Sequence, residues 1–225
     1  MNHDHTTPTP VRVIELADTA SRRPPDVTLV YTCVAGGAPL PWTGVARRVQ
    51  RIGGVRQLAL DRRIDASVMN ADPARTGHAL AADLDAALAH AFGAVVLVTH
   101  CLGGALAAAW AEHHPRRAAM LDGHVMVNVP AAPDPALVGE GLLTTLRAVP
   151  TVLVTGSQDP IADPASCHQW AEHLWAEADL VPGGGHMLPM THPDEVAASI
   201  THVIAIARAA RAHAADLGEI PGVEL

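Results

Sequence analysis

Residues 95–107 read VVLVTHCLGGALA, and this stretch decides the fold. Its first part belongs to an all-apolar run, residues 94–98, that is typical of a parallel strand buried on both faces. Its second part opens an Ala-rich segment, residues 102–114, whose composition favours a helix. A buried strand that runs into a helix within a few residues predicts a sharp turn at Cys101, where the following glycines let strand and helix pass closely.

The rest of the chain repeats this alternation of strands and helices. We expect strands at residues 11–16, 27–33, 55–60, 94–98, 123–129, 151–155 and 179–181. We expect helices at residues 42–51, 76–92, 102–114, 138–147, 165–177 and 193–217. The alternation predicts the α/β class, with a doubly wound, mostly parallel sheet and helices on both faces. For 225 residues we expect a flexible lead at 1–10 and a single domain at 11–225.

The composition argues against several classes of function. A net charge of −8 disfavours a general nucleic-acid binder, because such a protein needs a basic face. All 15 basic residues are Arg, and the absence of Lys excludes Walker-type phosphate binding, Schiff-base catalysis and pyridoxal phosphate attachment. His3 and His5 have no further ligands nearby, so we expect a solvated tail there instead of a metal site. We therefore expect neither a cofactor nor a metal.

Three features of the sequence bear on the compartment. No segment reaches the roughly 18 uninterrupted apolar residues of a membrane span. The first ten residues are polar and lack the apolar core of a signal peptide. The cysteines, Cys33, Cys101 and Cys167, are odd in number and widely spaced, which fits free thiols in a reducing compartment. We expect a cytoplasmic protein.

The predicted turn gives Cys101 a chemical role. A thiol at a helix N-terminus lies near the positive end of the helix dipole and near free N–H groups, and both favour the thiolate. The N–H of Leu102 would point at an oxyanion that develops beside the sulfur. The sequence therefore predicts a nucleophile at Cys101. A buried structural cysteine is the alternative, because lone cysteines are usually of that kind.

The same residues carry a resemblance to a known superfamily. The strand, turn and helix around Cys101 resemble the nucleophile elbow of the α/β-hydrolases, with Cys in place of the commoner Ser. The run CLGGALA is similar to the elbow of dienelactone hydrolases, whose nucleophile is Cys. Thr99 departs from the pattern, since the residue two before the nucleophile is usually Gly. The resemblance implies an α/β-hydrolase fold and a catalytic triad.

Two later loops resemble those that complete the triad. Residues 156–160, GSQDP, resemble the turn that carries the acid after a late strand, which points to Asp159. A Gly-rich loop that ends in His186 resembles the superfamily's catalytic histidine loop, and the order Cys, Asp, His matches. Asp163 and Asp134 are alternative acids, because each also follows a predicted strand. His192 competes with His186 but precedes a helix, where a cap or surface role is expected.

A second oxyanion donor should come from the loop after an early strand. Residues 33–38, CVAGGA, resemble the His-Ala-Gly-Gly-Ser stretch of type II thioesterases, with Val34 in place of His. On that alignment Ala35 donates its N–H, whereas an alignment to ordinary esterases chooses Val34. Cys33 is then expected near the site as a packing residue.

The covering of the site should be slight. About twenty residues separate the predicted strand that ends at 129 from residue 150, and they allow one helix at 138–147 where larger relatives insert a cap domain. We therefore expect a minimal cap or none. Trp42 and Met187 flank the motif loops and are candidates for a substrate wall, with plain core packing as the alternative.

A cysteine nucleophile restricts the reaction. Acylating a thiol from an unactivated alkyl ester is uphill, because a thioester is the less stable acyl compound. The first hypothesis is therefore hydrolysis or intramolecular transfer of an activated acyl group, from a small-molecule thioester, a carrier-bound acyl thioester or an activated ester or lactone. A second is a lyase or cyclase of natural-product biosynthesis, for example one that eliminates acetate. A third is a non-catalytic binding protein on a hydrolase scaffold.

Overall fold

The computed structural model describes residues 11–16, 24–32, 39–61, 83–101, 103–130 and 140–218. Seven strands form one sheet in the order β1-β3-β2-β4-β5-β6-β7. Their bounds are β1 Arg12–Glu15, β2 Val27–Tyr31, β3 Val55–Asp61, β4 Ala94–His100, β5 Gly123–Val127, β6 Thr151–Gly156 and β7 Glu177–Val181. Strand β1 pairs antiparallel with β3 at one edge, and every other pairing is parallel. The carboxyl ends of β2 to β7 therefore meet along one edge of the sheet.

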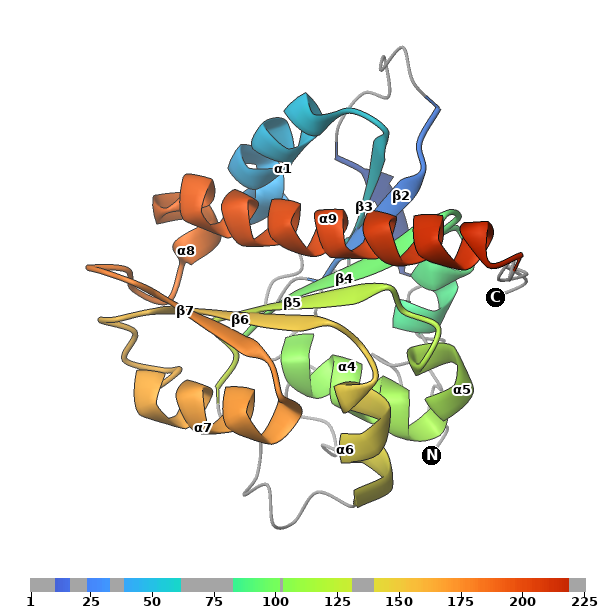
Figure 1. Ribbon diagram of the computed structural model, residues 1–225. Coiled ribbons are helices and arrows are strands. Elements are labelled where there is room, and N and C mark those ends of the chain that lie inside the picture. The colour runs from blue at the N-terminus through green and yellow to red at the C-terminus, as the bar shows by residue number, and fades with distance from the viewer. Residues whose placement is uncertain are drawn as a thin grey trace, which may run out of the picture.

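Helices cover both faces of the sheet (Figure 1). One face carries the 3₁₀ turn η1 (Leu40–Trp42), α1 (Thr43–Val49), η2 (Gln50–Ile52), α8 (Leu188–Thr191) and α9 (Pro193–Asp216). The other carries α4 (Gly103–His113), α5 (Pro115–Ala118), α6 (Glu140–Arg147) and α7 (Pro164–Leu174). Strands β2 and β4 are buried along their whole length, as expected of central parallel strands with helices on both faces.

The predicted α/β-hydrolase fold is confirmed, with differences at element ends. The helix predicted at 165–177 ends at Leu174, because Trp175 adopts a left-handed C-cap conformation (φ 55°, ψ 35°). The chain leaves that cap extended, so Glu177 begins β7 and not the end of a helix. Prolines at the first or second helical position open α5 and α8, two short helices that the apolar periodicity did not reveal.

Other predictions meet the structure only in part. Of the helix predicted at 76–92, residues 76–82 lie outside the described residues, 83–88 are helical, and Phe92 lies beyond the helix and is exposed. The predicted helix at 138–147 corresponds to α6, and residues 131–139 lie outside the described residues. The predicted flexible lead at 1–10 also lies outside them.

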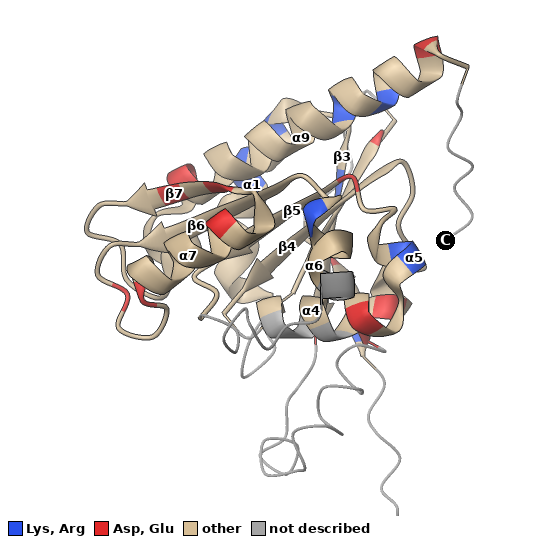
Figure 2. Cartoon of the chain, turned by 60° about the horizontal axis from the view of Figure 1, so that its bottom comes forward, with Lys and Arg blue, Asp and Glu red and all other residues tan. Residues whose placement is uncertain are grey.

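Acidic and basic positions are interspersed over the described helices and strands of both faces (Figure 2). Across the described ranges, no helix is long and apolar enough to cross a membrane. No group of three or more His, Cys, Asp or Glu side chains there is arranged to hold a metal ion.

Candidate active site

Cys101 occupies a strained turn between β4 and α4. Its φ angle is +53°, in the left-handed region that non-glycine residues seldom adopt. The Cys101 N–H donates to the Val127 carbonyl at 3.1 Å, and the Cys101 carbonyl accepts from the Gly104 N–H at 3.1 Å. The turn is therefore tied both to the neighbouring strand β5 and to the first turn of α4, and it holds a buried thiol.

The two glycines after the turn are required by close packing. A Cβ atom on Gly103 would lie 2.3 Å from Thr32 Oγ1, and one on Gly104 would lie 2.3 Å from Val129 Cγ1. The glycines therefore allow the start of α4 to lie close to the residues that follow β2 and β5. Thr99, which stands where relatives usually have Gly, is accommodated because its buried Oγ1 lies 3.0 Å from His124 Nε2.

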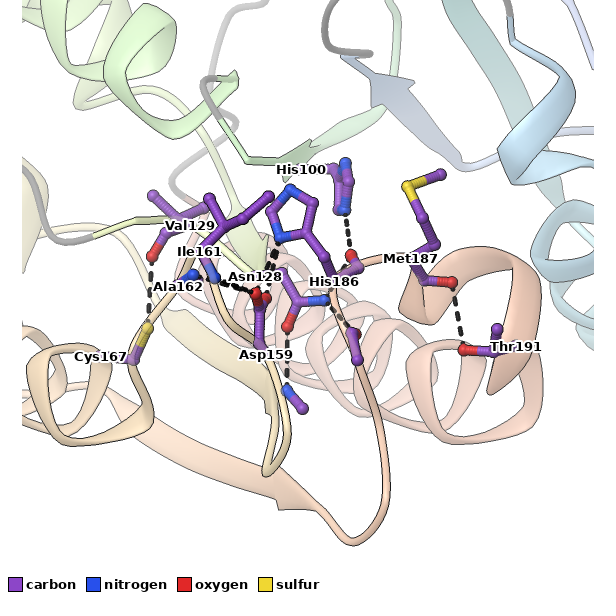
Figure 3. A network of polar contacts seen from close by, with 12 residues as sticks. His100, Asn128, Val129, Asp159, Ile161, Ala162, Cys167, His186, Met187 and Thr191 are labelled. Atoms are coloured by element: carbon purple, nitrogen blue, oxygen red, sulfur yellow. Dashed lines mark hydrogen bonds and ion pairs between the residues drawn. The ribbon is translucent and has the colours of Figure 1, made fainter.

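Asp159 and His186 form a close pair at the carboxyl end of β6 (Figure 3). His186 Nδ1 lies 2.9 Å from Asp159 Oδ2 and 3.1 Å from Oδ1. The carboxylate is fully buried, and its Oδ1 also accepts the N–H groups of Ile161 and Ala162 at 2.8 and 3.0 Å. A carboxylate at Nδ1 places the imidazole proton there, so Nε2 is left as the basic nitrogen.

Asn128 holds the histidine loop in place. Its Nδ2 donates to the carbonyls of Gly185 at 2.9 Å and His186 at 2.6 Å, and its Oδ1 accepts the Gly156 N–H at 2.9 Å. Asn128 is fully buried with a φ of +46°. One side chain therefore joins the ends of β5 and β6 to the loop that carries His186. The sequence shows an amide side chain directly after a buried strand, which is one signal of a site residue. It does not show which groups that side chain binds.

His100, the residue before Cys101, also contacts the histidine loop (Figure 3). Its Nε2 lies 2.8 Å from the His186 carbonyl, which can only accept, so Nε2 carries the proton. The two imidazole rings lie 5.0 Å apart between centroids. Burial lowers the pKa of His100 and so favours its neutral form. The end of β4 that bears Cys101 is thereby held against His186, and His100 is a second residue that sequence reasoning missed.

The alternative site residues are engaged elsewhere. Asp163 is the N-cap of α7, where its carboxylate accepts the N–H and the hydroxyl of Ser166 at 3.1 and 3.0 Å. These bonds lower the pKa of Asp163. His192 is the residue before α9, and its Nδ1 lies 2.9 Å from Thr191 Oγ1. Asp134 lies outside the described residues.

The predicted pocket and oxyanion residues divide into three groups. Trp42 is fully buried, donates from Nε1 to the Thr32 carbonyl at 3.2 Å and packs against Tyr31, which fits the alternative of core packing. Met187 follows His186 directly and is 38% exposed, so it remains a candidate wall. Leu102, Ala35, Val34 and Cys33 lie outside the described residues, and their predicted roles stay predictions.

Cys167 has a structural place. It is buried on α7 and donates its S–H to the Val129 carbonyl at 3.2 Å (Figure 3). Burial raises the pKa of this thiol, which keeps it protonated and unreactive. Of the two cysteines in the described part of the chain, Cys101 is the one on a left-handed turn between a strand and a helix.

Comparison with known proteins identifies the family of the chain. The sequence profile of a family described as serine hydrolase matches residues 55–192, more than half of the chain. The chain belongs to the serine hydrolase family. The matched segment includes the elbow, Asp159 and His186, although residues 99–104 of this member read THCLGG and contain no Ser. No curated protein sequence matches the chain significantly.

Solved structures of other hydrolases share the fold of this serine hydrolase family member. The thioesterase domain from the curacin biosynthetic pathway is 15% identical, over 85% of this chain and 95% of that one, with a TM-score of 0.60. A carboxylesterase structure from Nitrososphaera gargenis is 16% identical, over 88% and 95%, with a TM-score of 0.62. A thermophilic esterase from Thermogutta terrifontis is 16% identical, over 88% and 93%, with a TM-score of 0.61. Identities this low establish the fold alone.

Proposed function

We propose that this protein is a cysteine-dependent hydrolase or acyl transferase that acts on activated acyl compounds, namely thioesters and activated esters or lactones. The observation that carries the proposal is the position of Cys101 on the strained turn after β4, beside a loop in which His186 is paired to the buried Asp159. In the proposed triad Cys101 is the nucleophile, His186 the base and Asp159 the acid that orients the base.

The proposed first half-reaction is acylation of Cys101. His186 Nε2 accepts the thiol proton, and the sulfur attacks the acyl carbonyl to form a tetrahedral intermediate with a negative oxygen. The N–H groups of Leu102 and of Ala35, or Val34 on the alternative alignment, would stabilise that oxygen. His186 then gives its proton to the leaving thiolate or alkoxide, which departs and leaves an acyl-thioester on Cys101.

In the second half-reaction a water or a hydroxyl of the substrate replaces the leaving group. His186 takes its proton, the oxygen attacks the thioester, and the Cys101 thiolate leaves and is reprotonated. Asp159 holds the imidazole in the tautomer that both steps need and stabilises the imidazolium that forms in each. The product is a free acid with water, or a cyclic ester with an internal hydroxyl.

Because the proposed nucleophile is a thiol, we expect thioesters to be better substrates than plain alkyl esters. Transfer of an acyl group from one thiol to another is close to balanced, whereas transfer from an alkoxide to a thiol is unfavourable.

Steady-state kinetics on acetyl-CoA, p-nitrophenyl acetate and ethyl acetate test the proposal. We expect turnover of the first two and a loss of kcat of at least about a thousandfold in both Cys101→Ala and His186→Ala. Cys167→Ala, which removes the other described thiol, should keep its activity. An enzyme that retains its activity in Cys101→Ala but loses it in His186→Ala would instead abstract a carbon-bound proton, as in an eliminating lyase. No dependence on either residue would favour a binding protein.

A further inference from the structure

Four aromatic rings form a continuous row that ends at His186. Tyr31, the last residue of β2, packs against Trp42 of η1 with a distance of 4.9 Å between ring centroids. Trp42 meets the ring of His100 at 6.3 Å and an interplanar angle of 90°, and His100 lies 5.0 Å from His186. Separations of this size are those of aromatic rings in contact. Trp42 is therefore joined to His186 through one intervening ring.

Hydrogen bonds as well as packing hold Trp42 in place. Its ring is fully buried, and its Nε1–H donates to the Thr32 carbonyl at 3.2 Å. The Thr32 N–H in turn donates to the Val98 carbonyl of β4 at 2.9 Å. On the other side of the indole, the Tyr31 hydroxyl donates to Gln57 Oε1 at 2.7 Å. The indole therefore has a fixed position relative to both β2 and β4.

His100 connects this packing to the histidine loop (Figure 3). Its Nε2–H donates to the His186 carbonyl at 2.8 Å, and the same carbonyl accepts the Asn128 amide at 2.6 Å. A carbonyl oxygen has two lone pairs, so the backbone of His186 is held by two donors from two strand ends. Removing the indole of Trp42 would give the His100 ring room to rotate away from one of these two positions.

The charge of His100 matters as well as its position. In the proposed reaction His186 becomes an imidazolium, and a second positive charge 5.0 Å away would oppose that step. Burial, the largest cause, lowers the pKa of His100; the bond to the His186 carbonyl raises it, the charge of His186 lowers it and that of Asp159 raises it, and the net shift is downward. Trp42 contributes to this burial because its ring lies against His100. The indole thus favours a neutral neighbour for His186.

We propose that Trp42 is a positioning residue of the active site, which acts through His100 to hold His186 where its Nε2 can take the proton of the Cys101 thiol. His100 directly precedes Cys101, so one residue joins the turn of the nucleophile to the loop of the base. Core packing alone gives Trp42 an effect on stability, whereas positioning adds an effect on proton transfer. This inference rests on the proposed function, because it takes Cys101 as the nucleophile and His186 as the base.

Alkylation of Cys101 by iodoacetamide measures this proton transfer without any acyl substrate, because the thiolate is the reactive form of a cysteine. Mass spectrometry of the peptides separates Cys101 from the other thiols. We expect the alkylation rate at pH 7 to fall at least about tenfold in Trp42→Phe, toward the rate of His186→Ala. On acetyl-CoA, kcat should fall by a similar factor while KM stays within about twofold, because Trp42 does not touch the substrate.

Trp110→Phe is the matched control for the loss of a buried indole. Trp110 is 1% exposed on α4 and donates from Nε1 to Asp85 Oδ1 at 3.4 Å. Its replacement should lower the temperature of thermal unfolding as Trp42→Phe does, but should change neither the alkylation rate nor kcat. If Trp42→Phe does not fold, benzothienylalanine at position 42, which keeps the shape of the indole and lacks the N–H, takes its place in every comparison.

A double-mutant cycle with His100→Leu tests the route of the effect. If Trp42 acts through His100, Trp42→Phe should have little further effect on the alkylation rate once His100 is Leu. His100→Gln keeps an amide that can donate to the His186 carbonyl, so it should retain a higher alkylation rate and kcat than His100→Leu.

The two measurements separate this inference from the proposed function. A wild type that turns over no thioester but shows the expected alkylation pattern contradicts the proposed function and supports the positioning role of Trp42. An active wild type in which Trp42→Phe and Trp110→Phe have equal effects on both rates contradicts the positioning role and leaves the proposed function intact. Additive effects of Trp42→Phe and His100→Leu also contradict it, because Trp42 would then act by another route.

Discussion

At the scale of single residues, the site depends on side chains that position others. Asn128 satisfies three backbone groups from two segments of the chain, and His100 donates to the same His186 carbonyl. Asn128 and His100 bind the backbone of His186, whereas Asp159 binds its imidazole. We therefore expect the reactivity of the proposed triad to depend on Asn128 and His100 as well.

Asn128→Asp should weaken both the site and the fold. The change replaces a donor to two carbonyls with a carboxylate, so like-signed partial charges face each other in a buried place. We expect the free energy of unfolding to fall by roughly 2–4 kcal/mol and kcat to fall by at least about tenfold. Urea unfolding and steady-state kinetics measure the two effects. Gln169→Glu, the same chemical change at an exposed position of α7, is the control, and equal effects in both variants would contradict the role of Asn128.

His124 should make the stability of the protein depend on pH. Burial lowers the pKa of this histidine to about 4, so the folded state keeps it neutral while the unfolded chain protonates near its ordinary value. The contribution of neutral His124 to the free energy of unfolding is therefore fully present above the pKa of the unfolded state. It falls as the pH drops from about 6.5 toward 4, by roughly 3 kcal/mol over the whole window. His124→Gln keeps a hydrogen-bonding side chain beside Thr99 and removes the titration.

Urea unfolding at pH 7.5 and pH 5 provides the measurement. The difference in unfolding free energy between the two pH values should be smaller in His124→Gln than in the wild type, because that side chain no longer takes up a proton on unfolding. Identical differences in the two proteins would mean that His124 is accessible to solvent or charged in the folded state.

At the scale of the elements, the elbow is a contact between β4, α4 and the segment after β5. Gly104→Ala places a Cβ against Val129, and we expect a loss of roughly 1–3 kcal/mol of stability with a lower kcat, because α4 must move away and take Cys101 with it. Adding Val129→Ala makes room for the new Cβ and should restore most of the lost stability and of the lost kcat. A double-mutant cycle by urea unfolding and kinetics measures the coupling, and additive effects would contradict the contact.

The positions of strands and helices could be predicted from the sequence more readily than the hydrogen bonds that hold the site together. Buried runs such as 94–98 mark strands that are covered on both faces, and the glycines after Cys101 mark a close crossing. The end of α7 could not be predicted, because Trp175 adopts a left-handed conformation that local propensity does not favour. The partners of Asn128 lie 28 to 58 residues away, so only the folded chain reveals them. Trp42 was ambiguous because a flanking position in sequence does not indicate which way a ring packs.

At the scale of the whole molecule, α9 is joined to the end of the sheet that lies opposite the site. Arg208 binds Asp26 at 2.7 Å, and Arg211 binds Asp122 at 2.7 and 2.9 Å. Asp122 in turn accepts the Val95 N–H at 2.8 Å. Asp26 and Asp122 precede β2 and β5. The candidate site residues Cys101, Asp159 and His186 instead follow the carboxyl ends of strands. The ion pairs of α9 thus lie at one end of the sheet, and the candidate active site lies at the other.

Arg211→Gln should therefore lower stability without altering catalysis. The partly buried pair with Asp122 is lost, and we expect roughly 1–2 kcal/mol less stability with kcat/KM within about twofold of the wild type. Thermal unfolding measures the change in stability, and thioester kinetics measure kcat/KM. Arg116→Gln, at an exposed position of α5, is the matched control and should change neither. A fall in kcat/KM in proportion to stability would contradict the separation of the two ends.

A rapid-quench mass spectrum tests most directly whether Cys101 forms an acyl-enzyme. The chain contains no Lys, so acetylation of lysine side chains does not complicate the spectrum. After brief reaction with p-nitrophenyl acetate and acid quenching, we predict a single added acetyl group on the peptide that contains Cys101, and none in Cys101→Ala. An active enzyme whose quenched spectrum carries no acetyl group, or carries it on Cys167 or on the amino terminus alone, would contradict the account.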